Sequence, residues 1–210
     1  MAFSEYKNYT ASELKEIFKI EIQRSEDLFT NFKLSDKNYD FLQEDVKDML
    51  SRIRLSLSDN EATRSNLLVS HILWQASKVY KLDIFFEPVL NISQEETPDL
   101  PHQLNGKFDS ALTLDEIDFV RPIISIVEVK KSSLYDGLGQ CLAEMYATRK
   151  KFQQNRVYGI ITDGAEWEFL LLENSVLSIH TNNYYINTVS DIVDRIGYIA
   201  ERFRIVHEIT

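Results

Sequence analysis

The sequence predicts an α/β fold in which a central mixed β-sheet is flanked by helices. Three observations predict it. Apolar residues recur at helical spacing up to about residue 82, strand-like runs follow, and two further amphipathic helices lie between and after those runs. The resulting order of helix, three strands, helix, two strands and helix places helices on both faces of one mixed sheet.

The first 57 residues are expected to form a helical extension packed on the core, and residues 58–210 are expected to form that core. Two stretches of the extension carry apolar residues at helical spacing, and the polar run LSDKNYD separates them. The residues with this spacing are Leu14, Phe18, Ile22, Leu42, Val46 and Met49.

The segments of the core are bounded by turn or capping residues. Ser58, Asp59 or Asn60 can cap the first helix, whose expected buried stripe includes Leu67. The sequence DGA at 163–165 is typical of a tight hairpin turn between two strands. The expected helices are 58–82, 135–152 and 188–206, and the expected strands are 84–92, 106–114, 121–131, 156–162 and 166–172.

The composition is that of an ordinary globular chain, with 44% hydrophobic and 27% charged residues, and it excludes a low-complexity protein. No apolar run approaches the roughly 20 residues that span a bilayer, so no membrane partner is expected. The acidic N-terminus is not typical of a signal or transit peptide, and the single cysteine, Cys141, excludes an internal disulfide. These features predict a cytoplasmic protein.

The net charge of −10 argues against a nucleic-acid partner, but the charge is unevenly distributed. Lysines and arginines minus aspartates and glutamates give −3 for 1–60, −6 for 61–120, +4 for 121–156 and −5 for 157–210. The basic segment includes Arg149, Lys150 and Lys151. Two interpretations stay open: a solvated helix end whose cations complement the helix dipole, or a patch that contacts phosphates beside an acidic centre.

The most apolar expected strand, 121–131, ends in charged residues. Because side chains alternate across a strand, one face is expected to carry Ile124, Ile126, Glu128 and Lys130. The other face is expected to carry Ile123, Ser125, Val127 and Val129. A buried carboxylate is costly, so Glu128 needs a cation, hydrogen-bond donors or a metal ion as its partner. The strand is therefore expected to lead from the core to an opening.

Asp109 lies in the preceding expected strand, where strand propensity disfavours an aspartate. If the two strands pair through the acidic turn at 115–118, Asp109, Glu128 and Lys130 all lie toward the edge remote from that turn. Mg²⁺ prefers one or two carboxylates and keeps water and phosphate as its other ligands. A neighbouring lysine can hold phosphate or assist an attacking water. The sequence thus predicts a metal and phosphate site, with ordinary strand-end charges as the alternative.

At these residues the sequence resembles the PD-(D/E)XK nuclease superfamily, which has the restriction-endonuclease-like fold. The match is Asp109, 18 intervening residues and Glu128-Val129-Lys130. The residue before Asp109 is Phe108 instead of proline, and a literal Pro98-Asp99 lies in an expected loop as the less favoured alternative. The resemblance covers about residues 58–172.

Two further positions match residues that many members of this superfamily carry. Glu61 opens the helix before the sheet, where members often have an acidic residue that assists the metal site. Gln140 lies on the helix after the Glu-x-Lys strand, where many members place a glutamine near the substrate. Each has an ordinary interpretation as well: Glu61 as a surface pair with Arg64, and Gln140 as part of a solvated face with Glu144.

The resemblance implies a nuclease that uses Mg²⁺ or Mn²⁺ to hydrolyse phosphodiester bonds of nucleic acid, with DNA favoured over RNA. Asp109 and Glu128 would bind the metal with support from Glu61, Lys130 would position water or stabilise charge on the phosphate, and Gln140 would orient water or substrate. The expected contacts to the substrate backbone are Lys131, Arg149, Lys150 and Lys151. Because the net charge of −10 suggests weak nonspecific affinity for nucleic acid, a homodimer or a partner subunit is expected to supply the rest of the substrate-binding groove. The alternative is a catalytically inactive domain of the same fold that binds nucleic acid or protein.

Overall fold

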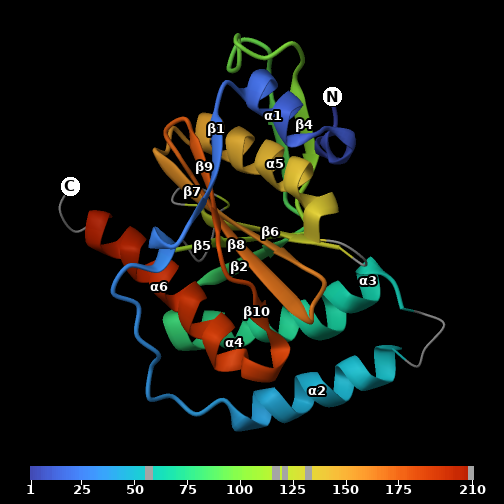
Figure 1. Cartoon of the computed structure of the whole chain (residues 1–210), viewed down its shortest axis with the longest axis vertical. Helices are drawn as coiled ribbons and strands as arrows, with labels where there is room; N and C mark the ends of the chain where they lie inside the picture. Colours follow the sequence, from blue (N-terminus) through green and yellow to red (C-terminus); the bar gives the residue numbers. More distant parts are fainter. Residues whose placement is uncertain (55–58, 115–118, 120–122, 131–133, 208–210) are drawn as a thin grey trace.

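Figure 1 shows the computed structural model of the chain, which describes residues 1–54, 59–114, 119, 123–130 and 134–207. The α/β fold predicted from the sequence is confirmed, with a central eight-stranded mixed sheet between helices. The strand order is β1-β9-β8-β7-β6-β5-β2, and β10 pairs with β8. Among the described residues, no helix has the length and apolar character needed to cross a membrane.

The helices are α1 (Ala11–Phe18), α2 (Asp40–Arg54), α3 (Glu61–Arg64), α4 (Ser70–Tyr80), α5 (Leu138–Lys151) and α6 (Val189–His207). The strands of the central sheet are β1 (Glu21–Ser25), β2 (Asp83–Phe86), β5 (Ser110–Thr113), β6 (Ile123–Val129), β7 (Arg156–Thr162), β8 (Glu166–Glu173), β9 (Val176–His180) and β10 (Tyr184–Tyr185). A separate hairpin consists of β3 (Val89–Ile92) and β4 (Leu104–Lys107).

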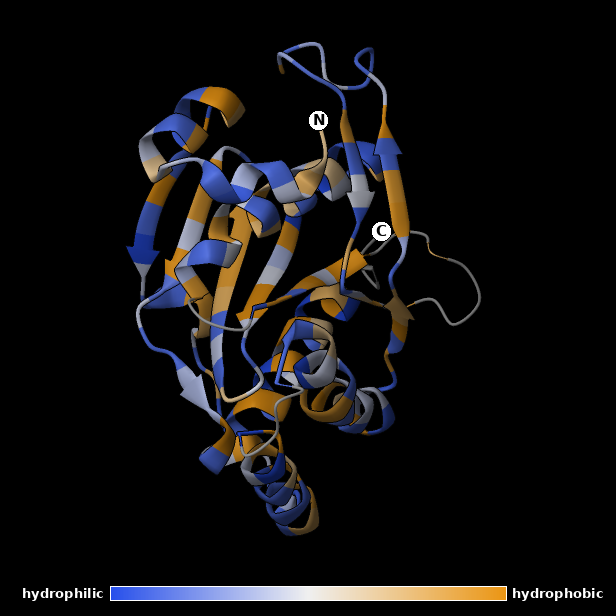
Figure 2. Ribbon diagram, turned by 90° about the vertical axis from the view of Figure 1, so that its right-hand side faces the viewer, coloured by the Kyte–Doolittle hydropathy of each residue, from blue (hydrophilic) through white to orange (hydrophobic). Residues whose placement is uncertain are grey.

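Helices cover both faces of the central sheet. Helices α1 and α5 lie on one face, and α4 and α6 lie on the other, with α2 outside them (Figure 1). Hydrophobic residues gather in the central strands and on the helix surfaces that meet them (Figure 2). All seven residues of β6 are buried, because this strand has β5 and β7 beside it and helices over both faces.

The prediction that the N-terminal stretch is helical is wrong for residues 21–25. Helix α1 ends at Phe18, its cap residue Lys19 adopts a left-handed φ of 52°, and β1 begins two residues later at Glu21. This strand pairs in parallel with β9, so Ile22 lies opposite Leu177. Ile20 and Ile22 also fit the two-residue period of a strand, and pairing with β9 decides between the two patterns. The N-terminal segment therefore supplies an edge of the central sheet.

Two expected strands are each broken into two. The stretch 84–92 divides at Glu87 and Pro88, where Glu87 has a left-handed φ of 48°, and 106–114 divides at Phe108 and Asp109. The two breaks face each other, because Glu87 N donates to the Asp109 carbonyl (3.2 Å) and Phe108 N donates to the Pro88 carbonyl (3.2 Å). Asp109 therefore lies directly before β5, and the prediction that it sits inside a strand is wrong.

A register shift in β6 changes which residues share a face. Leu112 of β5 lies opposite Ser125, but Thr113 lies opposite Ile123, so the strand carries an extra residue between them. Ile123 then packs with the core under α5, and Ile124 packs with the core under α4 and α6. The predicted faces are therefore wrong for Ile123 and Ile124, whereas Glu128 and Lys130 lie on one side, as expected.

Candidate active site at the carboxyl end of β6

An ion pair between Glu128 and Lys130 occupies the end of β6. The Lys130 ammonium contacts Glu128 Oε1, and the two side chains are only 11% and 1% exposed, respectively. The Lys130 backbone N–H donates to the Thr162 carbonyl (2.7 Å), which joins this strand end to the end of β7. Gly137 packs against the pair: an added Cβ would lie 3.3 Å from Lys130 Cγ and 2.7 Å from Ile161 Cγ2, so a larger residue here would force these side chains to shift.

Gln140 on α5 connects the ion pair to a second buried carboxylate. Its Nε2 donates to Glu128 Oε2 (2.9 Å) and to Glu144 Oε1 (3.0 Å), and its Oε1 accepts from Lys130 Nζ (3.3 Å). These three contacts fix the orientation of the amide. The interpretation of Gln140 and Glu144 as a solvated face is therefore wrong.

Glu144 is the residue of this cluster that sequence reasoning missed. Its side chain is fully buried, and its Oε2 has no hydrogen-bond partner among the described residues. Its sequence neighbours Ala143, Met145 and Ala147 are all buried as well, so α5 is apolar nearly all round. That is the one signal in the sequence that could have marked Glu144 as buried.

Asp109 is bound to the backbone of the Glu-x-Lys segment itself. Its Oδ2 accepts from the Val129 N–H at 2.7 Å, which is a short, charge-assisted hydrogen bond. Asp109, Glu128 and Lys130 thus lie together at one end of the paired strands β5 and β6, as the sequence predicts. The turn at 115–118, through which the strands were expected to pair, lies outside the described residues. Asp99 is remote from this contact and pairs with Lys19 instead (3.4 Å).

Glu61 lines the same pocket as Asp109. Asn60 caps α3 by accepting from Thr63 N (2.9 Å), and Glu61 is the first residue of that helix. A pocket of about 700 Å³ is lined by Glu61, Asp109 and Val129 together with other residues of α3, α4 and β2. Glu61 and Asp109 therefore border one space, as a shared metal site requires.

Arg64 fixes the position of α3 over the sheet. Its guanidinium is buried and binds Asp59 Oδ1 (2.7 Å) and, across the fold, Asp163 Oδ2 (2.9 Å). The expected surface pair between Glu61 and Arg64 is therefore not the arrangement found, because Arg64 is committed to these two aspartates. The next residues, Ser65–Val69, form a π-helical turn, which rotates Leu67 outward and makes its predicted burial wrong.

The carboxyl groups of the site hold their protons more tightly than usual. Burial raises the pKa of Asp109, and burial together with the Asp109 charge raises the pKa of Glu128 to about 8. Burial and the Glu128 charge raise the pKa of Glu144 well above its usual range. Three carboxyl groups thus lie around one ammonium group, and a bound cation would lower their pKa values by favouring the ionised forms.

The raised pKa of Glu144 predicts a pH-dependent stability. A carboxyl group that keeps its proton in the folded state stabilises the fold below its unfolded pKa, and this contribution is lost as pH rises toward the folded pKa. The groups that face Glu144 are Gln140, Glu128, Asp109 and Lys130. We expect the free energy of unfolding to fall between pH 5 and 8, and Glu144→Gln to flatten this slope by up to about 1.4 kcal/mol per pH unit.

Urea unfolding at four pH values in this range tests the expectation. Glu16→Gln, which changes an exposed carboxylate on α1, serves as the matched control and should leave the slope unchanged. An unaltered slope in Glu144→Gln would show that Glu144 is ionised in the folded protein.

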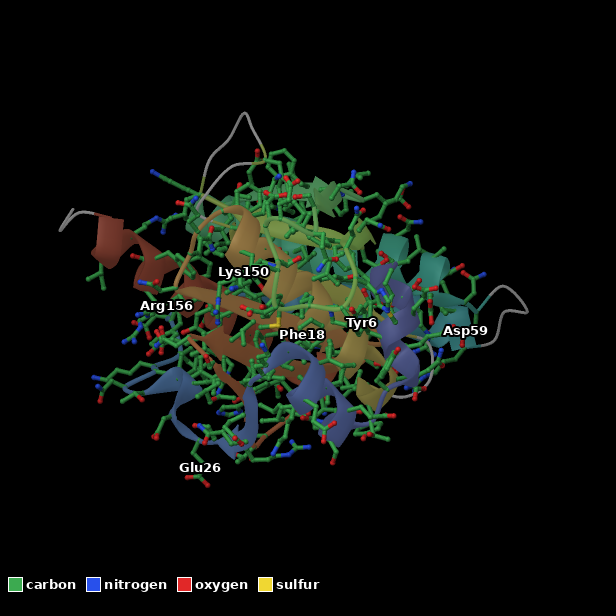
Figure 3. All side chains as sticks on the ribbon, turned by 90° about the horizontal axis from the view of Figure 1, so that it is seen from above. Tyr6, Phe18, Glu26, Asp59, Lys150 and Arg156 are labelled. Carbon is green, nitrogen blue, oxygen red and sulfur yellow. The ribbon has the colours of Figure 1, made fainter. Side chains whose placement is uncertain are left out.

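The structure does not bring the expected phosphate contacts to this site. Arg149, Lys150 and Lys151 lie at the end of α5, and Gln140 lies near its start, so nine residues, or roughly 14 Å of helix, separate them. Figure 3 shows Lys150 well apart from Asp59, which flanks α3. Lys151 pairs with Glu96 (2.8 Å), and burial lowers the pKa of Arg149. Lys131 lies outside the described residues.

The donor set suits a hard divalent cation that keeps part of its hydration shell. Among the described residues, no group of three or more His, Cys, Asp or Glu side chains is arranged to hold a metal ion by itself. Mg²⁺, however, commonly takes only one or two carboxylates, and its other ligands are water and substrate phosphate. Asp109 and Glu128, whose charges interact, meet this smaller requirement in number, and Glu61 lines the same pocket as Asp109.

Comparison with known proteins gives a distant relative. No protein-family model matches the chain. Crinkler effector protein 1 of Rhizophagus irregularis is 26% identical over 150 residues, which cover 67% of this chain and 30% of that protein. The match thus spans less than a third of the relative's length.

Proposed function

We propose that this chain is a metal-dependent nuclease of the PD-(D/E)XK superfamily that hydrolyses phosphodiester bonds of nucleic acid, with DNA as the expected polymer. The observation that carries the proposal is the 2.7 Å hydrogen bond from the Val129 N–H to Asp109. It joins Asp109 to the centre of Glu128-Val129-Lys130, so the residues of the motif share one strand end beside a pocket. Members of the PD-(D/E)XK superfamily use this combination of an aspartate and a Glu-x-Lys segment for cleavage.

Each residue of the site has a separate expected role in phosphodiester hydrolysis. Asp109 and Glu128 would hold Mg²⁺ or Mn²⁺, which supplies charge neutralisation and a more acidic water when bound. Lys130 keeps an ammonium group in a buried position, where its attraction for a phosphate oxygen is stronger than in water. Gln140 fixes Glu128 and Lys130 relative to each other through its amide. Glu61 would act from the far side of the pocket, through water.

Asp109→Asn tests the metal site without removing the hydrogen bond to Val129. The asparagine amide oxygen can still accept from the Val129 N–H, so the fold should be kept while the charge is lost. We expect cleavage of a panel of supercoiled plasmid, linear duplex, single-stranded DNA and RNA with Mn²⁺ to fall at least about 100-fold, or roughly 2.7 kcal/mol. Isothermal titration calorimetry should show a parallel loss of Mn²⁺ affinity.

Asp99→Asn is the matched control, since Asp99 belongs to the literal Pro-Asp pair and is exposed in a surface ion pair with Lys19. It should cleave and bind Mn²⁺ like the unmodified protein. Equal activity in both variants, each folded by circular dichroism, would contradict the assignment of Asp109. No cleavage of any substrate by the unmodified protein would contradict the nuclease proposal.

The second candidate function is a binding module that keeps the fold without cleaving. Two observations favour it: the net charge of −10, and the placement of Arg149, Lys150 and Lys151 away from the acidic cluster. Binding of a protein, or of nucleic acid, that needs no metal and is unaffected by Asp109→Asn would support it. The similarity to Crinkler effector protein 1 is compatible with either function as one part of an effector protein.

A further inference from the structure

Two aromatic side chains are exposed beside the pocket that contains Asp109. Phe86, at the end of β2, is 54% exposed and lines the pocket, and Trp74 on α4 is 59% exposed. Single exposed hydrophobic residues are common on protein surfaces, so neither is informative alone. Their position next to a carboxylate-lined pocket indicates a common role.

The arrangement of α4 and β2 brings the two aromatic residues to one side of the pocket. The two elements pack against each other and are adjacent in Figure 1. Ser70 at the start of α4 lines the same pocket as Phe86. Trp74 is four residues after Ser70, so it lies on the same face of the helix, one turn farther along. Phe86 therefore forms part of the wall, and Trp74 extends the aromatic surface outward from it.

The charges of the pocket indicate which part of a nucleic acid can enter it. Its described lining residues include the acidic Glu61, Glu87 and Asp109 and the uncharged polar Ser65, Asn66 and Ser70, but no lysine or arginine. Phosphate groups are repelled by such a lining except where a cation binds to the carboxylates. A nucleobase has no net charge, and an aromatic ring with hydroxyl and amide groups around it can both stack on a base and hydrogen-bond its edge.

We propose that Phe86, extended by Trp74, is a stacking site for an unpaired nucleobase next to the phosphate that a cation at Asp109 and Glu128 would hold. The inference rests on the proposed function and narrows its substrate to single-stranded or locally unpaired nucleic acid. The pocket volume of about 700 Å³ lies within the usual range for ligand sites. Bases inside an intact duplex are stacked on each other and reach such a ring only after unpairing.

Phe86→Ala tests the stacking site. The probe is a fluorescently labelled single-stranded 12-nucleotide DNA, whose binding is followed by anisotropy and whose cleavage is followed in Mn²⁺. We expect Phe86→Ala to weaken binding and to slow cleavage at subsaturating DNA by roughly 5- to 100-fold, since stacking on one aromatic side chain has effects of this size. Phe86→Tyr should restore both. Trp74→Ala should have a smaller effect in the same direction.

Phe41→Ala is the matched control, because Phe41 on α2 is 86% exposed and does not line the pocket. It should bind and cleave the probe like the unmodified protein. If the unmodified protein binds the probe through Phe86 but cuts nothing, the stacking site stands and the nuclease proposal fails. If single strands are cut and Phe86→Ala and Trp74→Ala change neither binding nor cleavage, the stacking site is overturned, the nuclease proposal stands, and a protein partner for this aromatic surface becomes the better explanation.

Discussion

Replacing Lys130 with methionine is expected to abolish cleavage and, at pH 9, where Glu128 is ionised, to destabilise the protein by about 3–5 kcal/mol. Methionine has nearly the same length as lysine but no charge, so the Glu128 carboxylate, only 1% exposed, loses its cation. A buried carboxylate without a partner carries the full cost of its desolvation unless it takes up a proton. The two losses have separate causes, because cleavage needs the ammonium group itself and stability needs the charge balance.

The double variant Glu128→Gln/Lys130→Met separates these causes. Removing both charges leaves a neutral amide within reach of Gln140, so stability should return to within about 1–2 kcal/mol of the unmodified protein, while cleavage stays absent. Urea unfolding and the cleavage panel measure the two quantities on the same samples. Lys151→Met, which breaks a half-exposed pair with Glu96, should change stability by less than about 1 kcal/mol. Full cleavage by Lys130→Met would contradict the role of Lys130.

Replacing Asp194 with alanine is expected to be the most damaging change away from the site, at about 3–5 kcal/mol. Asp194 on α6 is buried and accepts from Tyr80 OH (2.6 Å), Tyr39 OH (2.7 Å), Ser35 N (2.7 Å) and Ser35 Oγ (2.9 Å). Burial raises the pKa of Asp194, but these hydrogen bonds lower it by more. Alanine leaves the donors of α4 and of the segment before α2 unsatisfied at once.

Urea unfolding of Asp194→Ala beside Asp191→Ala measures this effect. Asp191 lies one turn earlier on the same helix and makes one ion pair, with Arg195 (2.7 Å), so its removal should cost less, about 1–2 kcal/mol. Equal losses in the two variants would show that the hydrogen bonds to Asp194 contribute nothing beyond an ordinary helix pair.

The sequence predicted the structure best where a local residue pattern, together with the pairing of neighbouring strands, was sufficient to place a residue. Glu128 and Lys130 end an apolar strand, and antiparallel pairing with the preceding strand brought Asp109 to the same edge. The hairpin at 163–165 and the closing helix also follow from local patterns alone. These features depend on contacts between residues that are near each other in sequence, which a single sequence records directly.

The remaining features depend on contacts that no local pattern encodes. β1 is a strand because β9 is available to pair with it, and Ile22 fits helical and strand periods equally well. Glu144 looks like a solvated helix residue at four-residue spacing from Gln140, and only the packing of α5 against the sheet buries it. The break at Asp109 is set by the left-handed backbone of Glu87, a residue on another strand.

The pairing of β1 with β9 has a consequence for how the chain acquires its structure during synthesis. Gln23 and Ser178, which hydrogen-bond across this pair, are 155 residues apart in sequence. At a translation rate of roughly 5–20 residues per second, β1 leaves the ribosome at least about 8 s before its partner strand. Its backbone groups stay unpaired for that time, as in any open strand edge. The short length of β1 and its exposed Glu21 and Arg24 lower the risk that it pairs with another nascent chain before β9 arrives.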